Sequence, residues 1–243
     1  MKAARAFVEE LARCDREVAR LRVTLHGSLA WTGRGHGTDS AILLGLSGLS
    51  PETIDPDSVG ELLTRIRDDR TIDCPDIGRL DFDPDADLVF DHERQLPRHT
   101  NGMNFVGLAA DDSEVLTANY YSLGGGFIAR DDEPEVSDQQ GEPPLPFTTS
   151  EALLRQAESA GLTIAALVMR NELHWREREE IEQRIEDIWN AMRDCIERGL
   201  RTEGVLPGRM AVKRRAARLY KTLSARGKPE PLDSLEWVTA FAI

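Results

Sequence analysis

Apolar residues recur at helical spacing along the start of the chain, at Phe7, Val8, Leu11 and Val18. This spacing predicts an amphipathic helix, because side chains three and four positions apart share one helical face. The alternation at Val23–Leu25, just ahead of a glycine, predicts a strand. The chain therefore opens with a helix followed by a strand.

An uninterrupted apolar run follows Thr38 and Asp39. Either residue can cap a helix, so we expect a buried helix that begins there. Leu62, Leu63 and Ile66 mark the buried face of another short helix. For the Asp-rich stretch 73–87 we expect only short extended pieces.

Residues 102–130 contain three β-like stretches separated by polar or glycine-rich turns, which predicts an antiparallel meander. The segment 131–149 is acidic and contains four prolines, a composition typical of an exposed linker. We expect a first domain over residues 1–135, a linker over 136–149 and a second domain over 150–243.

From Ser150 onward the pattern is helical, with a helix over 153–161 and a long charged helix around 165–198. The long helix carries one apolar stripe, which we expect to be buried as in a helical bundle: Ile181, Ile185, Ile188, Met192 and Ile196. The predicted fold class is an α+β N-terminal domain, with antiparallel strands and helices, followed by an all-α segment.

The charge balance argues against nucleic acid as a partner, because 43 acidic and 30 basic residues leave a net charge of −13. The basic stretch 209–228 has the charge spacing of a solvated helix face. Neither a membrane-spanning apolar run nor a secretory signal is visible, so we expect a cytoplasmic protein without a membrane partner.

The three cysteines, Cys14, Cys74 and Cys195, lack the tight spacing of zinc or iron-sulfur sites. We interpret them as buried or idle thiols and expect no metal site within this chain.

The stretch 26–39 is the most informative for chemistry, because Gly33, Gly35 and Gly37 surround His36 just before the predicted helix. Glycines allow positive φ and expose backbone N–H groups to an anion. The positive end of the helix disfavours imidazolium, so we expect His36 to be neutral and able to accept a proton. A glycine-rich turn with a surface histidine remains the alternative. The stretch matches neither a P-loop nor a dinucleotide fingerprint.

Two further stretches have both a structural and a functional interpretation. Asn101-Gly102 is the strongest dipeptide signal for a tight turn. The three glycines in 124–126 indicate either close backbone approach or a bulge between strands.

Together these stretches resemble a known family, the bacterial iron-sulfur-dependent L-serine dehydratases, also called L-serine ammonia-lyases. The resemblance implies an α/β domain similar to allosteric serine-binding domains, followed by a helical catalytic domain. Its matching blocks are GSLAWTGRGHGTDSAILLGLSGLSPETID (27–55), HTNGM (99–103), YYSLGGGF (120–127), NEL (171–173) and TEGVLPG (202–208).

The resemblance also implies the chemistry: L-serine is converted to pyruvate and ammonia without pyridoxal phosphate. An iron of a [4Fe-4S] cluster would act as Lewis acid on the serine hydroxyl, while His36 would remove the α-proton. Thr38 and Asp39 would cap the helix and steady the imidazole. The remaining candidates for the substrate pocket are His99, Asn101, Gly102, Met103, Ser122, Gly124 and Gly125. We expect L-serine as substrate and a homodimer.

The family pattern extends beyond both ends of this sequence. Family members carry a serine-rich segment ahead of the position of Met1, and their cluster cysteines lie beyond Ile243. We therefore expect this chain to be a fragment that is inactive alone and binds no cluster. The alternative is a non-catalytic serine-binding or assembly module. The helices after Ser150 argue against an unrelated amino-acid sensor.

Overall fold

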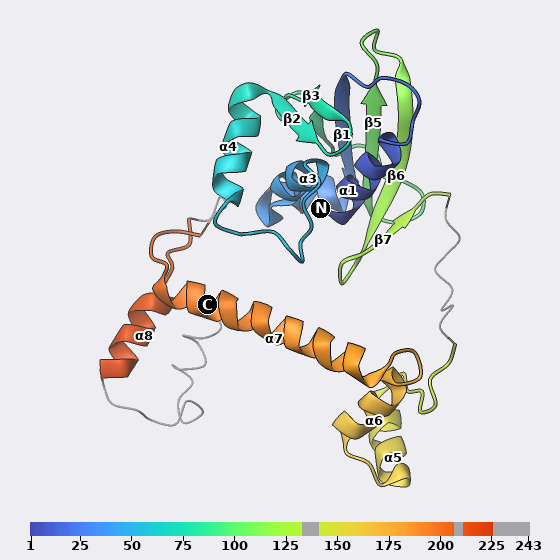
Figure 1. Cartoon of the computed structure of the whole chain (residues 1–243), viewed down its shortest axis with the longest axis vertical. Coiled ribbons are helices and arrows are strands. Elements are labelled where there is room, and N and C mark those ends of the chain that lie inside the picture. Colours follow the sequence, from blue (N-terminus) through green and yellow to red (C-terminus); the bar gives the residue numbers. More distant parts are fainter. Residues whose placement is uncertain (133–140, 207–210, 226–243) are drawn as a thin grey trace. The chain divides into compact units, whose positions relative to one another are not determined.

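The computed structural model describes residues 1–132, 141–206 and 211–225 (Figure 1). The chain forms two compact units, Met1–Val136 and Ser137–Ile243. The described part of the first unit combines a sheet with helices. That of the second is helical apart from an isolated bridge between Val205 and Lys213. The expected α+β region followed by helices is thereby confirmed.

The sheet of the first unit has seven strands in the order β2-β3-β1-β5-β6-β7, with β4 paired to β1. It is mixed, because β1 runs parallel to β3 and β4 but antiparallel to β5. The expected meander is confirmed as β5, β6 and β7. The strands are β1 (Arg20–Gly27), β2 (Thr71–Cys74), β3 (Gly78–Asp81), β4 (Leu88–Asp91), β5 (Asn101–Leu108), β6 (Glu114–Gly124) and β7 (Phe127–Arg130).

Five short helical segments accompany this sheet: α1 (Lys2–Leu11), α2 (Ser28–Thr32), the 3-10 helix η1 (Gly33–His36), α3 (Thr38–Leu46) and α4 (Val59–Asp69). The predicted helices at α1, α3 and α4 are confirmed, although Val18 lies outside α1. Capping of α3 by Thr38 or Asp39 is wrong, because Gly37 occupies the cap position and no side chain caps the helix. The left-handed backbone of Gly37, with φ of 69°, turns the chain into α3.

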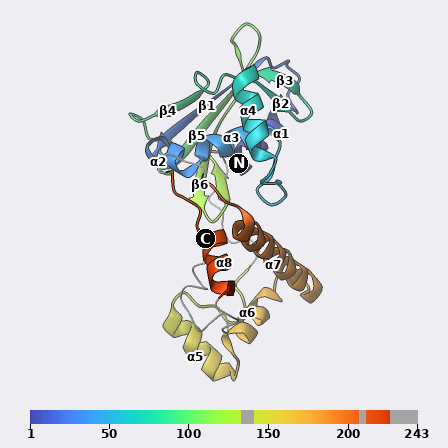
Figure 2. The ribbon, with the colours of Figure 1, turned by 90° about the vertical axis from the view of Figure 1, so that its left-hand side faces the viewer.

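Helices α1 and α3 cover one face of the sheet (Figures 1 and 2). Phe7 of α1 stacks on Phe105 of β5 with 5.3 Å between ring centroids, and Phe105 meets the edge of Tyr120 at 5.7 Å. Glu10 fastens the end of α1, since its carboxylate accepts hydrogen bonds from the Tyr120 hydroxyl and the Arg130 guanidinium, each at 2.6 Å.

The predicted turn at Asn101-Gly102 is wrong, because both residues belong to β5 and pair with β1. A β-carbon on Gly102 would lie 2.9 Å from Leu96 Cδ1. Glycine is required there because Leu96 packs closely over the strand, and not because the chain reverses.

The helices of the second unit are α5 (Ser150–Ala160), α6 (Ile164–Glu172), α7 (Arg178–Arg201) and α8 (Ala216–Ala225). The single long helix expected around 165–198 is wrong, since the chain breaks between Glu172 and Arg178. None of the described helices is long and apolar enough to span a membrane.

Burial of the apolar stripe on α7 is largely wrong. Ile181 is buried, but Ile185, Ile188 and Met192 are each more than half exposed. Among the described elements α8 is the main partner of α7, and it leaves this part of the helix uncovered.

Asn171 of α6 is buried, with an exposed fraction of 7%, and holds the segment that precedes α5. Its Oδ1 accepts from the Leu145 N–H at 2.9 Å, and its Nδ2 donates to the Leu145 carbonyl at 2.8 Å. Trp175 Nε1 donates to the Gly141 carbonyl at 3.2 Å. Residues 141–149 of the predicted linker therefore contact the helices, and residues 133–140 lie outside the described part.

Candidate active site

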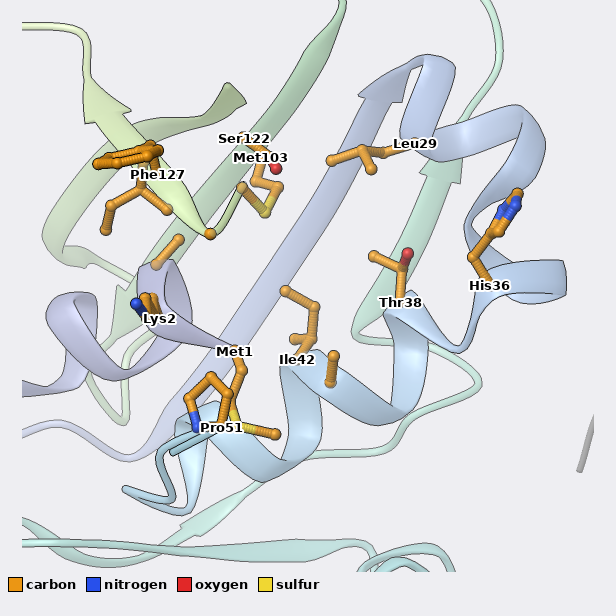
Figure 3. A pocket seen from close by; sticks show the side chains of 14 residues that line it. Met1, Lys2, Leu29, His36, Thr38, Ile42, Pro51, Met103, Ser122 and Phe127 are labelled. Atoms are coloured by element: carbon orange, nitrogen blue, oxygen red, sulfur yellow. The ribbon is translucent and has the colours of Figure 1, made fainter. Parts of the chain in front are cut away.

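A cavity of about 250 Å³ lies in the first unit, where the start of α1, the segment from α2 to α3 and the β6–β7 turn meet (Figure 3). Four of the candidates from the sequence line it: His36, Thr38, Met103 and Ser122. The other lining residues are Met1, Lys2, Ala3, Leu29, Ala41, Ile42, Pro51, Gly126, Phe127 and Ile128. The site therefore combines hydroxyl groups and two basic side chains with an apolar wall.

His36 ends η1 on one side of this cavity, and its ring orientation is set by a backbone contact. Nδ1 lies 3.0 Å from the carbonyl oxygen of Thr32, one turn earlier. Because a carbonyl can only accept, Nδ1 must carry the proton. In the neutral ring Nε2 then has a free lone pair, so the exposed imidazole can accept a proton there.

Thr38 and Asp39 follow His36, and the hydrogen bond of the His36 ring is made with the Thr32 carbonyl. The Thr32 carbonyl steadies the imidazole, and a role of Thr38 and Asp39 in this stays a prediction. Thr38 lines the cavity, whereas Asp39 does not. A β-carbon on Gly33 would lie 3.2 Å from Thr38 Cβ, so this glycine lets the turn approach the start of α3.

His99, Asn101 and Gly102 lie outside the cavity wall and organise the strands behind it. The N–H of Asn101 donates to Nδ1 of His99 at 3.1 Å, and Asn101 Nδ2 donates to the Ser122 carbonyl at 3.2 Å. This second bond joins β5, which supplies Met103 to the cavity, to β6, which supplies Ser122.

The glycines in 124–126 have φ of 92°, 59° and 81° and make the reversal between β6 and β7. The register shifts between Ser122 and Gly124, which bears out the bulge interpretation. Gly126 lines the cavity, while Gly124 and Gly125 do not.

The sequence analysis missed Lys2, Leu29, Ile42, Pro51 and Phe127 as lining residues. Phe127 directly follows the glycines and was the one visible signal. The position of Lys2 depends on packing of α1 against strands more than a hundred residues later, which no local pattern reveals.

Close by in the sequence, His26 is a buried histidine that the sequence analysis also missed. Its exposed fraction is 7%, and its Nδ1 makes no hydrogen bond and lies 3.5 Å from Asp91 Oδ2. Burial lowers its pKa, although the Asp91 carboxylate opposes this shift. His26 does not line the cavity.

Within the described residues, no group of three or more His, Cys, Asp and Glu side chains is arranged to hold a metal ion. Cys14, Cys74 and Cys195 are free thiols, in the segment after α1, in β2 and in α7 respectively, and burial raises the pKa of Cys74 to about 12. The described residues therefore do not fit a [4Fe-4S] cluster, which needs about four converging ligands.

Comparison with known proteins gives the class to which this fold and site belong. Residues 1–133 match the family model of the serine dehydratase beta chain, and residues 159–243 match that of the serine dehydratase alpha chain. The chain belongs to the serine dehydratase family.

Several curated relatives are similar over the whole chain. The L-serine dehydratase of Streptomyces coelicolor is 40% identical over 248 residues, and L-serine dehydratase 2 of Escherichia coli is 37% identical over 251. The L-serine dehydratase of Mycobacterium tuberculosis is 35% identical over 258 residues. Each alignment covers 100% of this chain but only 53–54% of the relative. The chain thus spans about half the length of these relatives.

Proposed function

We propose that this chain is the part of an L-serine ammonia-lyase that binds L-serine and removes its α-proton, leading to pyruvate and ammonia. The single observation that carries the proposal is the contact between His36 Nδ1 and the Thr32 carbonyl. It leaves Nε2 as a proton acceptor at a cavity that matches the size of a small substrate. Membership of the serine dehydratase family supports L-serine as that substrate.

The cavity residues suggest how the substrate is handled. Thr38 and Ser122 offer hydroxyl groups for hydrogen bonds to polar atoms of the amino acid. His99 and Asn101 are positioning residues, since they fix β5 against β6. Loss of the α-proton to His36 and loss of the β-hydroxyl as water leave aminoacrylate, which hydrolyses to pyruvate and ammonia.

The iron-sulfur cluster implied by the family resemblance would have to be held by ligands other than the described residues. The steps proposed for this chain therefore involve its own side chains only. We further propose a cytoplasmic homodimer active in amino-acid catabolism and gluconeogenesis, as the resemblance implies.

The test joins the chain to the regions of the Streptomyces coelicolor relative that precede and follow its match to this chain. The product is reconstituted anaerobically with iron and sulfide, and pyruvate formed from L-serine is measured. We expect turnover that falls by about 100-fold or more in His36→Gln, the usual scale for loss of a general base. The residual reaction should show a larger α-deuterium isotope effect, because C–H cleavage becomes more rate-limiting.

His92→Gln is the matched control, because His92 is exposed and lies outside the cavity lining. Near-normal turnover of His36→Gln would sink the assignment of the base. Binding of L-serine without any turnover, under conditions in which the intact relative is active, would favour the non-catalytic binding module.

A further inference from the structure

The ionisable side chains that line the cavity are all basic. Lys2 and His36 are its basic side chains, and no Asp or Glu is among the residues that line it. Figure 3 shows Lys2 on the side opposite His36 and Thr38. Lys2 and His36 therefore supply positive charge and a proton acceptor on different sides of the cavity.

One helix begins at this cavity and adds to its positive character. Helix α3 starts at Thr38, and no side chain caps it. The first N–H groups of a helix have no intrahelical acceptor, and they carry the positive end of the helix dipole. An uncapped helix start and a lysine in the wall of one cavity form a suitable environment for a carboxylate.

The Lys2 ammonium has a defined position in this environment. Its Nζ lies 2.7 Å from Glu52 Oε1. A β-carbon on Gly126 would lie 3.6 Å from the same nitrogen, so the ammonium rests against the β6–β7 turn. The side chain is 44% exposed, which leaves its remaining donors accessible.

We propose that Lys2 binds the α-carboxylate of the substrate, and that Glu52 competes with that carboxylate for the Lys2 ammonium. The proposal rests on the proposed function and specifies its substrate class as small amino acids with a free carboxylate. Glu52 pairs with Lys2 but does not line the cavity. A carboxylate bound in the cavity can therefore bind the Lys2 ammonium together with Glu52 or displace Glu52 from it.

Glu52 remains a carboxylate over the whole physiological range. Hydrogen bonds from Lys2 and Ser50 lower the pKa of Glu52 to about 2. The competition is therefore constant with pH, and neutralising Glu52 should strengthen substrate binding. Substitution of Lys2 and substitution of Glu52 should therefore change the affinity for L-serine in opposite directions. An ion pair with a structural role alone would not give this result.

The experiment measures binding of L-serine and of L-serinamide, which lacks the carboxylate, to the 243-residue chain by NMR titration. Lys2→Met should weaken L-serine binding by about 10-fold or more, the scale of a charge-assisted contact, and leave L-serinamide binding unchanged. Glu52→Gln should tighten L-serine binding by about threefold or more. Arg5→Met is the matched control, because Arg5 is an exposed residue of α1 that pairs with Glu9 outside the cavity.

Circular dichroism establishes that each variant folds. Unchanged L-serine affinity in Lys2→Met, or equal loss of L-serine and L-serinamide binding, would overturn the role of Lys2 while leaving the proposed function intact. Weaker L-serine binding in Glu52→Gln would overturn the competition. Failure of the parent chain to bind L-serine at all would overturn both the proposed function and this inference.

Discussion

The imidazoles of His36 and His99 are held in opposite tautomers. Nδ1 of His36 donates to a backbone carbonyl, whereas Nδ1 of His99 accepts from a backbone N–H. The neutral His36 ring therefore presents a lone pair at Nε2, and the neutral His99 ring presents an N–H there. The first is suited to accept a proton and the second to donate a hydrogen bond.

This assignment predicts two distinct nitrogen spectra. At a pH at which both rings are neutral, long-range proton–nitrogen NMR should report the Nδ1–H tautomer for His36 and the Nε2–H tautomer for His99. Histidine-to-glutamine variants at each position assign the signals. The same tautomer at both sites would contradict the geometry.

Gly27 is a glycine at which a side chain should be poorly tolerated. Its φ is 56°, and a β-carbon would lie 2.3 Å from the Thr100 carbonyl oxygen. Gly27→Ala should lower the free energy of unfolding by about 1–3 kcal/mol, because a residue with a β-carbon is strained at this positive φ. Gly35→Ala is the control, because the space around that position is open, and it should be nearly neutral. Urea denaturation measures both; equal stability of the two variants would refute the prediction.

The side chain of Asn171 should contribute to the free energy of unfolding through its two hydrogen bonds to the Leu145 backbone. Asn171→Ala leaves the partly buried Leu145 peptide without its side-chain partners and should cost about 1–3 kcal/mol of the free energy of unfolding. Hydrogen exchange at the Leu145 amide should accelerate correspondingly. Gln183→Ala, which removes an exposed bond to Asp187, is the control and should change stability by no more than about 0.5 kcal/mol. Unaltered exchange in Asn171→Ala would refute the role.

His26 predicts a loss of stability on mild acidification. Because burial lowers its pKa below the usual 6.5, the unfolded chain takes up a proton at a higher pH than the folded chain. As pH falls below about 6.5, the free energy of unfolding should decline, by up to about 1.4 kcal/mol per pH unit from this group. His26→Gln should flatten that slope between about pH 6.5 and pH 5.5 in urea denaturation, and His92→Gln should not. An identical slope in the parent and in His26→Gln would contradict it.

Local patterns were sufficient where one residue type dominates a short segment. The apolar run in 41–46 identifies α3, and alternation with glycine turns identifies β5, β6 and β7. They failed where a distant contact decides the conformation. Gly102 was interpreted as a turn because its packing against Leu96 is not visible in the dipeptide.

The sequence predicted only those residues of the candidate site that lie in stretches of unusual composition. His36, Thr38, Met103 and Ser122 lie in stretches with unusual composition, and all four line the cavity. Lys2 lies in an ordinary amphipathic helix, and only the sheet beneath α1 brings it to the cavity. For the apolar stripe of α7 the pattern predicted burial that the structure does not show. Periodicity identifies an apolar face but not the surface that covers it.

The attachment of α1 through Glu10 also has a consequence for the order of folding. Its bonds to Tyr120 and Arg130 close loops of 110 and 120 residues, so they form only after β6 and β7 have joined the sheet. Because the same helix brings Lys2 to the cavity, we expect the cavity to be completed late, when the sheet already exists. The first residues of the chain would then be among the last to take their native place.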